Sequence, residues 1–576
     1  MNQKLENILN VSLDATEDEL RKADSLSTGY NWRDNTWEII VKYSGSLESI
    51  RNRYNVYIKE LLNYYAIIVA DKATIELISQ EDVIDYVEKP KSLYYQIERT
   101  KTAACVGSVR ADGNILSGKG VIVGVIDTGI DIFDNAFRNS DGTTRILNIY
   151  DQTTGEKYDK QSIDEYIRLN EDLSGGTFSY DNAPGVDNIM HGTDVSYIAA
   201  GSLGVAYEAD IIAVKMGYSI NNQFPRTTSL MDAIDYIIRK AIEYRKPVAV
   251  NISYGCNYGA HNGNTLLESF IDDISKSYRC VICVGSGNEA DKAIHFGGII
   301  NTGQVQTAYL SVGEYQSAID IQIWKNYWDT IDVMLINPRG EQIGIITEGR
   351  INRYETYNTE IITLLGEPSP YNIYQEIYIN LIPKTDYILS GIWQIVLMAG
   401  SIRAGEYNIW LPSSQALGYA TAFNNPTADG TITIPATARN CIAVGAYNAY
   451  TNSYAAFSGR GFDNSIRNVN AGVKPDITAP GVDISIARQR GNDITYRNVT
   501  GTSYAVPVVT GAAALLMQWG IVMGNDRFMY GEKLKAALID GSKPVGLVGI
   551  TRNDNQPDPR TGWGAVCLKN TPNKIL

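Results

Sequence analysis

Three short motifs in this 576-residue sequence carry an acid, a base and a nucleophile. Asp127 follows the apolar run Val121–Ile126, and His191 opens a His-Gly-Thr sequence before an apolar helical run. Ser503 lies in a Gly-Thr-Ser sequence that precedes another apolar run. A carboxylate that orients an imidazole, which in turn takes the proton of a hydroxyl, is the proton relay of serine hydrolases. Each residue alone could be a turn cap, a structural histidine or a helix N-cap, but their combination predicts a nucleophilic hydrolase.

The scarcity of histidine narrows the choice of base. The chain contains only His191, His261 and His295. Only His191 is followed by two small residues at a predicted helix start, a pattern that packing explains poorly. Because imidazole is the side chain that exchanges protons near neutral pH, we expect His191 to be the base. Asp127 is expected at the carboxyl end of a parallel strand, where α/β proteins build their sites.

Two features could stabilise an oxyanion. Ser503 is expected at the N-terminus of a buried helix formed by Val508–Trp519, where free backbone N–H groups favour developing negative charge. Asn288 follows Gly285-Ser286-Gly287 at the end of the apolar strand Cys280–Val284. We therefore expect its side-chain amide to donate a hydrogen bond alongside the Ser503 backbone N–H.

Apolar strands that alternate with amphipathic helices must position these residues. From about Lys119 the expected strands are Val121–Ile126, Ile211–Lys215, Val248–Ser253 and Val281–Val284. One expected helix places Leu230, Ile234, Ile237, Ile238, Ala241 and Ile242 on a single apolar face. The alternation predicts an α/β fold with a doubly wound parallel sheet covered on both faces.

Two further units interrupt or precede this pattern. The first hundred residues predict a small α+β unit, with strands Trp37–Tyr43, Tyr64–Ala70 and Val83–Val87 and with helices from Ser46 and Lys72. From Val305 to Leu411 the apolar residues alternate with a period of two, as in Ile319–Trp324. This period and the turn signals between the runs predict an antiparallel β-sandwich inserted into the α/β domain.

Composition excludes several classes of protein. Hydrophobic residues make up 44% and charged residues 20% of the chain, as in ordinary globular proteins. A net charge of -14 disfavours nucleic acid and anionic lipid as partners. Because no apolar stretch of membrane-spanning length and no signal peptide are apparent, we expect synthesis in the cytoplasm and no membrane span. The six scattered cysteines favour reduced thiols over a disulfide framework, and the Cys280/Cys283 pair falls within one predicted buried strand.

These motifs resemble the subtilase family of serine endopeptidases, and the resemblance runs from about Gly120 to Leu568. Further segments that carry it are Val250–Gly255, Phe457–Gly461 and Lys474–Gly481. The resemblance implies substrate contacts at Ser253, Tyr254 and Gly255, and also at Gly285, Ser286 and Gly287.

The commoner subtilase patterns carry histidines where this chain has Asp194 and Val508. Neither position belongs to the triad, but Asp194 is expected to influence the basicity of His191. Calcium sites are common in subtilases, but the sequence contains no dense loop of oxygen ligands, so we predict no metal or other cofactor.

The N-terminal unit resembles a subtilase propeptide, which implies cleavage between Gln96 and Ile97. The propeptide and the insertion together resemble the Csp-type subtilases of clostridial spores, which implies that the insertion is a jelly roll. The predicted domains are a propeptide (1–96), the first part of the subtilase domain (97–300), the insertion (301–425) and the second part (426–576). The expected partners are the chain's own propeptide, bound non-covalently, and a protein substrate such as the zymogen of a spore cortex-lytic hydrolase. The protein itself is then expected to be associated with the spore. The alternatives are a pseudoprotease that acts as a regulator or germinant sensor, and a general bacterial subtilase with no link to spores.

Overall fold

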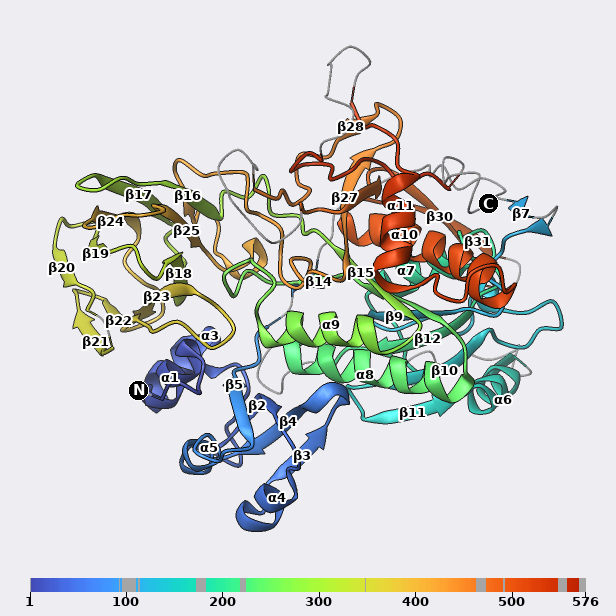
Figure 1. The fold of residues 1–576 in the computed structure, drawn as a ribbon, viewed down its shortest axis with the longest axis horizontal. Coiled ribbons are helices and arrows are strands. Elements are labelled where there is room, and N and C mark those ends of the chain that lie inside the picture. Colours follow the sequence, from blue (N-terminus) through green and yellow to red (C-terminus); the bar gives the residue numbers. More distant parts are fainter. Residues whose placement is uncertain are drawn as a thin grey trace.

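The computed structural model describes residues 2–92, 94–95, 110–111, 114–171, 183–217, 224–347, 349–462, 473–490, 493–546 and 557–568. Three units are visible in Figure 1: an N-terminal unit in blue, a β-rich unit in green and yellow, and a larger α/β unit. The short strand pairs outside their main sheets are β6 (Tyr94–Tyr95) with β14 (Tyr254–Gly255), β7 (Arg110–Ala111) with β8 (Asn114–Ile115), and β30 (Ile484–Arg490) with β31 (Asp493–Val499).

A nine-stranded sheet forms the centre of the α/β unit. Its strands are β9 (Ile122–Asp127), β10 (Ile146–Asp151), β11 (Glu156–Asp159), β12 (Asp210–Lys215), β13 (Val248–Ile252), β15 (Cys280–Gly285), β27 (Ile442–Asn448), β28 (Ser453–Tyr454) and β29 (Ile477–Pro480). The order is β11-β10-β12-β9-β13-β15-β27-β28, with β29 also on β27, and only β11 and β28 are antiparallel to their neighbours. Parallel pairing in register brings the carboxyl ends of β9, β12 and β13 to one edge of the sheet.

Helices cover both faces of this sheet, as predicted for a doubly wound α/β fold. On one face α8 (Thr227–Tyr244) and α9 (Leu266–Ser277) share a core with Ile122 and Ile126 of β9. On the other face α6 (Lys160–Glu171), α7 (His191–Ala200), α10 (Thr502–Met517) and α11 (Gly531–Asp540) share a core with Val123 and Val125. One detail of the prediction is wrong: Ile242 is 45% exposed, because it lies near the end of α8, beyond the edge of the apolar face. The segment Thr502–Val522, formed by α10 and the turn Gln518–Val522, is apolar and long enough to cross a membrane, but 78% of the apolar 18-residue stretch within it is buried inside the fold.

Two antiparallel sheets enclose the core of the insertion. The first has the order β16-β25-β18-β23-β22-β21 and the second β20-β19-β24-β17-β26. The strands are β16 (His295–Ile299), β17 (Val305–Val312), β18 (Ile319–Asn326), β19 (Ile331–Ile336), β20 (Gln342–Ile345), β21 (Ile351–Glu355), β22 (Thr359–Leu365), β23 (Tyr374–Pro383), β24 (Gly391–Ala399), β25 (Glu406–Trp410) and β26 (Ala422–Phe423). Alternate residues of both sheets, such as Ile321 and Ile395, form one apolar core, which is the arrangement expected of a sandwich.

The N-terminal unit is an α+β fold with more helix than the sequence predicted. Its elements are α1 (Asn7–Asp14), α2 (Glu17–Lys22), α3 (Asp24–Ser27), β1 (Tyr30–Asn31), β2 (Thr36–Tyr43), α4 (Glu48–Tyr54), β3 (Tyr57–Glu60), β4 (Tyr65–Ala70), α5 (Lys72–Ile78) and β5 (Ile84–Glu88). The sheet order is β1-β2-β4-β3, with β5 also on β2. The three N-terminal helices and the strands β1 and β3 were not predicted, because they are too short to show a clear period. A capping box between Thr16 and Glu19 was the local signal for α2.

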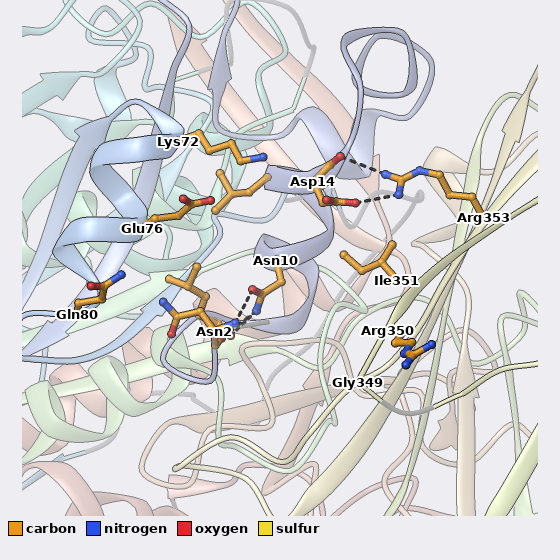
Figure 2. A pocket seen from close by; sticks show the side chains of 12 residues that line it. Asn2, Asn10, Asp14, Lys72, Glu76, Gln80, Gly349, Arg350, Ile351 and Arg353 are labelled. Carbon is orange, nitrogen blue, oxygen red and sulfur yellow. Dashed lines mark hydrogen bonds and ion pairs between the residues drawn. The ribbon is translucent and has the colours of Figure 1, made fainter.

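This N-terminal unit packs against both other units. Its core includes Ile362, Leu364, Tyr378 and Ile382 from strands β22 and β23 of the insertion. On the α/β unit, the ring of Tyr65 contacts Phe270 of α9 edge to face, with 5.2 Å between centroids. A cleft of about 970 Å³ lies between α1, α5 and β21. Figure 2 shows the side chains that line it, with Asp14 paired with Arg353 at one side; these two residues are 2.8 Å apart. The N-terminal unit is therefore clamped between the insertion and the helices that cover the sheet.

Candidate active site

Asp127 and His191 meet where two elements of the α/β unit adjoin. Asp127 is the last residue of β9, and His191 is the first residue of α7. Their Oδ1 and Nδ1 atoms are 2.6 Å apart, and the two side chains are 1% and 2% exposed. Asp127 Oδ1 also accepts a hydrogen bond from the Thr128 backbone N–H at 2.8 Å. Because an ionised carboxylate can only accept, it places the proton on Nδ1 and leaves Nε2 as the basic nitrogen.

Close backbone packing explains the glycine that follows the histidine. The Gly192 N–H donates to Thr128 Oγ1 at 2.9 Å. A Cβ at position 192 would lie 2.3 Å from the carbonyl oxygen of Gly129 and 2.9 Å from Cβ of Asp127. A side chain at this position would therefore push α7 away from β9 and separate His191 from Asp127.

Ser503 is the second residue of α10, and its neighbours fix its place. The preceding Gly501 has a φ of 148°, a left-handed value that favours glycine. The ring of Tyr504 lies 5.3 Å from that of His191. On the other side, Ser253 Oγ donates to the Ser503 carbonyl oxygen at 3.3 Å. Ser503 therefore lies between the histidine and the end of β13.

A chain of polar side chains, which was not predicted from the sequence, supports the segment around Ser253 and Ser503. Thr510 Oγ1 donates to Asn251 Oδ1 at 3.1 Å, and Asn251 Nδ2 donates to Ser253 Oγ at 3.0 Å. All three side chains are buried. A polar residue inside an otherwise apolar strand, as at position 251, was the signal that could have found this network.

The side chain of Asn288 is oriented like an oxyanion donor. Its Oδ1 accepts hydrogen bonds from the backbone N–H of Thr502 at 3.0 Å and from Thr502 Oγ1 at 3.1 Å. These bonds fix the amide, so its Nδ2 must point the other way. This Nδ2 is buried and has no hydrogen-bond partner among the described residues. Since an unpaired buried donor is costly, the arrangement suits a site where an acceptor arrives with the substrate.

The predicted substrate strand is occupied by the chain itself. Strand β6 pairs antiparallel with β14, placing Tyr95 opposite Tyr254 and Tyr94 opposite Gly255. The predicted cleavage site, Gln96 and Ile97, lies outside the described residues. The segment directly before it nevertheless lies along the strand that was expected to hold substrate.

The second predicted substrate segment, Gly285 to Gly287, borders the same site. Gly285 ends β15, and the Ser286 carbonyl oxygen accepts from the Thr433 N–H at 3.0 Å. A Cβ at Gly287 would lie 2.6 Å from the Thr433 side chain. The absence of a side chain at Gly287 therefore allows the segment around Thr433, which returns from the insertion, to pack against this glycine.

The other two histidines lie away from the triad. The rings of His261 and His295 both stack on the ring of Trp410, at centroid distances of 4.1 and 4.9 Å. Their ring nitrogens lie within hydrogen-bond distance of the backbone oxygens of Ile432 and Thr427. These residues join the insertion to the α/β unit.

Asp194, which replaces a histidine of the commoner pattern, is buried and paired. It forms ion pairs with Arg488 and Arg497, and its side chain is 0% exposed. The predicted influence of Asp194 on the basicity of His191 must therefore include two positive charges that were not predicted from the sequence. Alternation of Arg488 and Arg490 along one strand was a signal for Arg488, whereas nothing in the sequence indicated that Arg497 would pair with Asp194.

Among the described residues, neither a metal-ligand cluster nor a reactive thiol is evident around the site. Within the described part of the chain, no group of three or more His, Cys, Asp or Glu side chains is arranged to hold a metal. Burial raises the pKa of four thiols to about 12, those of Cys256, Cys280, Cys283 and Cys441. Burial also raises the pKa of the Tyr504 hydroxyl further above its ordinary value, so this phenol stays neutral beside His191.

The α/β sheet and the Asp-His-Ser arrangement at its edge define the class of serine peptidases. Residues 118–368 and 404–564 match the model of the subtilase family, and residues 3–91 match that of the Csp protease B prodomain. The chain belongs to the subtilase family. The sequence-based assignment to subtilases with a Csp-type prodomain is thus confirmed.

Comparison with solved structures gives the same answer. The CspB protease of Clostridium perfringens has 34% sequence identity and a TM-score of 0.72, over 79% of this chain and 93% of that chain. Two curated fungal proteins match more locally. The subtilase-type proteinase RRT12 of Saccharomyces cerevisiae is 33% identical over 22% of this chain, and subtilisin-like protease 10 of Arthroderma otae is 34% identical over 21%. These matches span only 23% and 27% of the fungal proteins, about a quarter of their length.

Proposed function

We propose that this chain is a serine endopeptidase in which Asp127, His191 and Ser503 form the triad and Asn288 is the oxyanion donor. Ser503 Oγ attacks the scissile carbonyl carbon while His191 Nε2 takes its proton. The Asn288 Nδ2 and the Ser503 backbone N–H stabilise the oxyanion, and His191 then protonates the leaving amine. Water completes the acyl transfer by the same route. The single observation that carries this proposal is the buried 2.6 Å contact between His191 and Asp127 beside the N-terminus of α10.

The first substrate in this proposal is the chain itself. Strand β6 lies on β14 in the antiparallel manner of a bound substrate, and it follows the N-terminal unit directly. Cleavage shortly after Tyr95 would leave the new C-terminus of the prodomain in the site. Because the prodomain is also clamped by the insertion and α9, we propose that it stays bound non-covalently after cleavage.

The wider role that we propose follows from likeness to the Csp-type proteases. It is the activation of a zymogen of a spore cortex-lytic hydrolase during germination, which places the protein in the spore. A regulator without catalysis is the alternative, but all three triad residues are present and two of them are in contact. We also propose that catalysis needs no metal or other cofactor.

The test compares the purified chain with Ser503→Ala by gel electrophoresis and intact mass. We expect the unaltered chain to yield an N-terminal fragment of about one hundred residues, whereas the variant stays whole, because triad loss costs several powers of ten in rate. Cleavage of both chains at the same position would assign the cut to another protease. If both chains stay whole, catalysis is not the function and the search should turn to ligands of a regulator.

A further inference from the structure

The backbone directly before His191 adopts a conformation that its surroundings must enforce. Met190 has a φ of 68° and a ψ of 11°, a left-handed conformation that residues other than glycine adopt at a cost. Asp187, which is completely buried, accepts hydrogen bonds from the backbone N–H groups of Met190 and Thr193 at 2.7 and 2.8 Å. Asp187 thus caps the start of α7 from one side.

An arginine holds the same turn from the other side. Arg488 donates from Nη2 to the Met190 carbonyl oxygen at 2.9 Å and from Nε to Asp194 Oδ1 at 3.0 Å. One planar guanidinium therefore binds the residue before the catalytic base and the residue one helical turn after Met190. A flexible ammonium cannot reproduce this fixed geometry.

Three arginines lie on one face of the hairpin formed by β30 and β31. In the register of this hairpin Arg497 pairs with Ile486 and Arg488 with Thr495, so Arg488, Arg490 and Arg497 point to the same side. Arg497 forms a second ion pair with Asp194. Arg490 Nε lies 2.6 Å from Asp131 Oδ2, and the Asp131 N–H donates to Thr193 Oγ1 at 3.0 Å. We name this set of three arginines the arginine face.

The hairpin also leads into the nucleophile. Strand β31 ends at Val499, and α10 begins at Thr502, one residue before Ser503. Figure 1 shows α7 and the two strands of the hairpin gathered on the same side of the α/β unit. The hairpin that leads to Ser503 is therefore the same hairpin whose arginines bind the helix of His191.

From these contacts we propose that Arg488 is a positioning residue for the catalytic base. It holds the start of α7 against the hairpin, so that His191 and Ser503 keep their relative placement. Asp194 anchors the guanidinium, and Arg497 supplies the remaining charge. The proposal rests on the triad assigned under Proposed function.

Charge and geometry can be separated, because Arg488 and Arg497 share Asp194 but only Arg488 contacts Met190. Asp194 and its two arginines carry a net charge of +1. Arg488→Gln and Arg497→Gln each reduce it to zero, Asp194→Asn raises it to +2, and the double variant Arg488→Gln with Asp194→Asn restores +1. The other ionisable groups around the His191 turn, which all variants keep, are Asp127, Asp131, Asp187, Arg490 and Tyr504.

The experiment measures the rate at which a small fluorophosphonate labels Ser503 between pH 5 and 9. We expect Arg488→Gln to lower the limiting rate about 10- to 100-fold and Arg497→Gln less than 5-fold, as a 1 Å misplacement at a reacting centre costs about 10²-fold. Both variants should move the acid limb to higher pH, because a less compensated carboxylate favours the imidazolium. Asp194→Asn should move it to lower pH. The double variant should return the limb to its original pH while the rate stays low.

Two controls keep the result interpretable. Tyr496→Thr alters an exposed hairpin residue without touching the ion pairs, and it should label like the unaltered chain. Arg488→Lys keeps the charge and should lower the rate without moving the acid limb. It replaces Arg488→Gln as the test of geometry if Arg488→Gln does not fold. Equal rates for the Arg488 and Arg497 variants, or a full rate in the double variant, would overturn the proposal. An unaltered chain that is neither cut nor labelled would instead overturn the proposed function.

Discussion

The oxyanion donor gives a prediction whose size follows from two hydrogen bonds. Asn288→Ala removes a buried N–H donor that Thr502 holds in place through Oδ1. Loss of one such donor in subtilisin lowers kcat by about 10²- to 10³-fold, or ~2.7–4 kcal/mol of transition-state stabilisation. The Ser503 N–H remains, so we expect a loss in this range rather than complete inactivity.

Thr502→Val provides the matched, milder change. It removes the 3.1 Å hydrogen bond from Oγ1 to Asn288 and keeps the 3.0 Å bond from the backbone N–H. A neutral hydrogen bond contributes ~1 kcal/mol. If that amount is lost from the orientation of the amide in the transition state, the rate falls about fivefold.

The assay follows release of the N-terminal fragment after cell-free synthesis of each chain, with Ser503→Ala as the baseline. Thermal unfolding of each purified variant checks that the fold persists. Asn288→Asp is a second test, because a carboxylate accepts both bonds from Thr502 but presents no donor to the oxyanion; we expect it to be at least as slow as Asn288→Ala. The reasoning fails if Asn288→Ala is processed at the original rate, or if Thr502→Val slows processing as much as Asn288→Ala.

Three further predictions concern the clamp around the prodomain and the thiols. Leu364→Ala should cost about 2–5 kcal/mol of stability, since this insertion side chain is fully buried in the prodomain core; a tagged, cleaved prodomain should then co-purify in smaller amounts, and unchanged retention would refute the clamp. Burial raises the pKa of Glu376 to about 8, so the docked state holds a proton that the separated parts release. Prodomain docking should therefore be tightest below about pH 4.5 and weaken as pH rises toward 8. Retention is measured between pH 5 and 7, below the window where Lys89, with a pKa lowered to about 7, has the opposite effect. It should fall in the original chain and fall less steeply in Glu376→Gln, because burial also raises the pKa of Glu6 to about 7 and that of Asp320 to about 6, so these two groups still titrate in the variant. Iodoacetamide should leave the four thiols of raised pKa unmodified in the native protein and modify them after unfolding, as peptide mass mapping would show; modification in the native state would contradict their burial.

Local sequence determined the parts of this protein whose physics is local. Strands such as β9 and β15 are buried on both faces, so continuous apolar runs marked them to within a residue or two. Asp127, His191 and Ser503 were found because each lies at an element terminus beside small residues. Glycines at positions 192 and 501 report close packing and a left-handed backbone, which few other residues tolerate.

The short N-terminal helices and the exposure of Ile242 are features that the local sequence pattern did not predict. A helix of four to eight residues spans barely two turns, so its period cannot be read reliably. Such helices are stabilised by what they pack against, here strands β22 and β23 some 350 residues away in sequence. The position of Ile242 is set by where α8 leaves the sheet, which no helical period reveals.

The sequence by itself determined the subtilase fold class, the inserted β unit and the identity of the triad candidates. Only the tertiary structure decided that Asp194 is paired with Arg488 and Arg497, that Thr502 orients Asn288, and that β6 lies on β14. The physical reason is the sequence separation over which each kind of interaction acts. Apolar periodicity and turn chemistry act over a few residues, whereas ion pairs and strand pairing join segments hundreds of residues apart, whose partners are fixed only when the chain is packed.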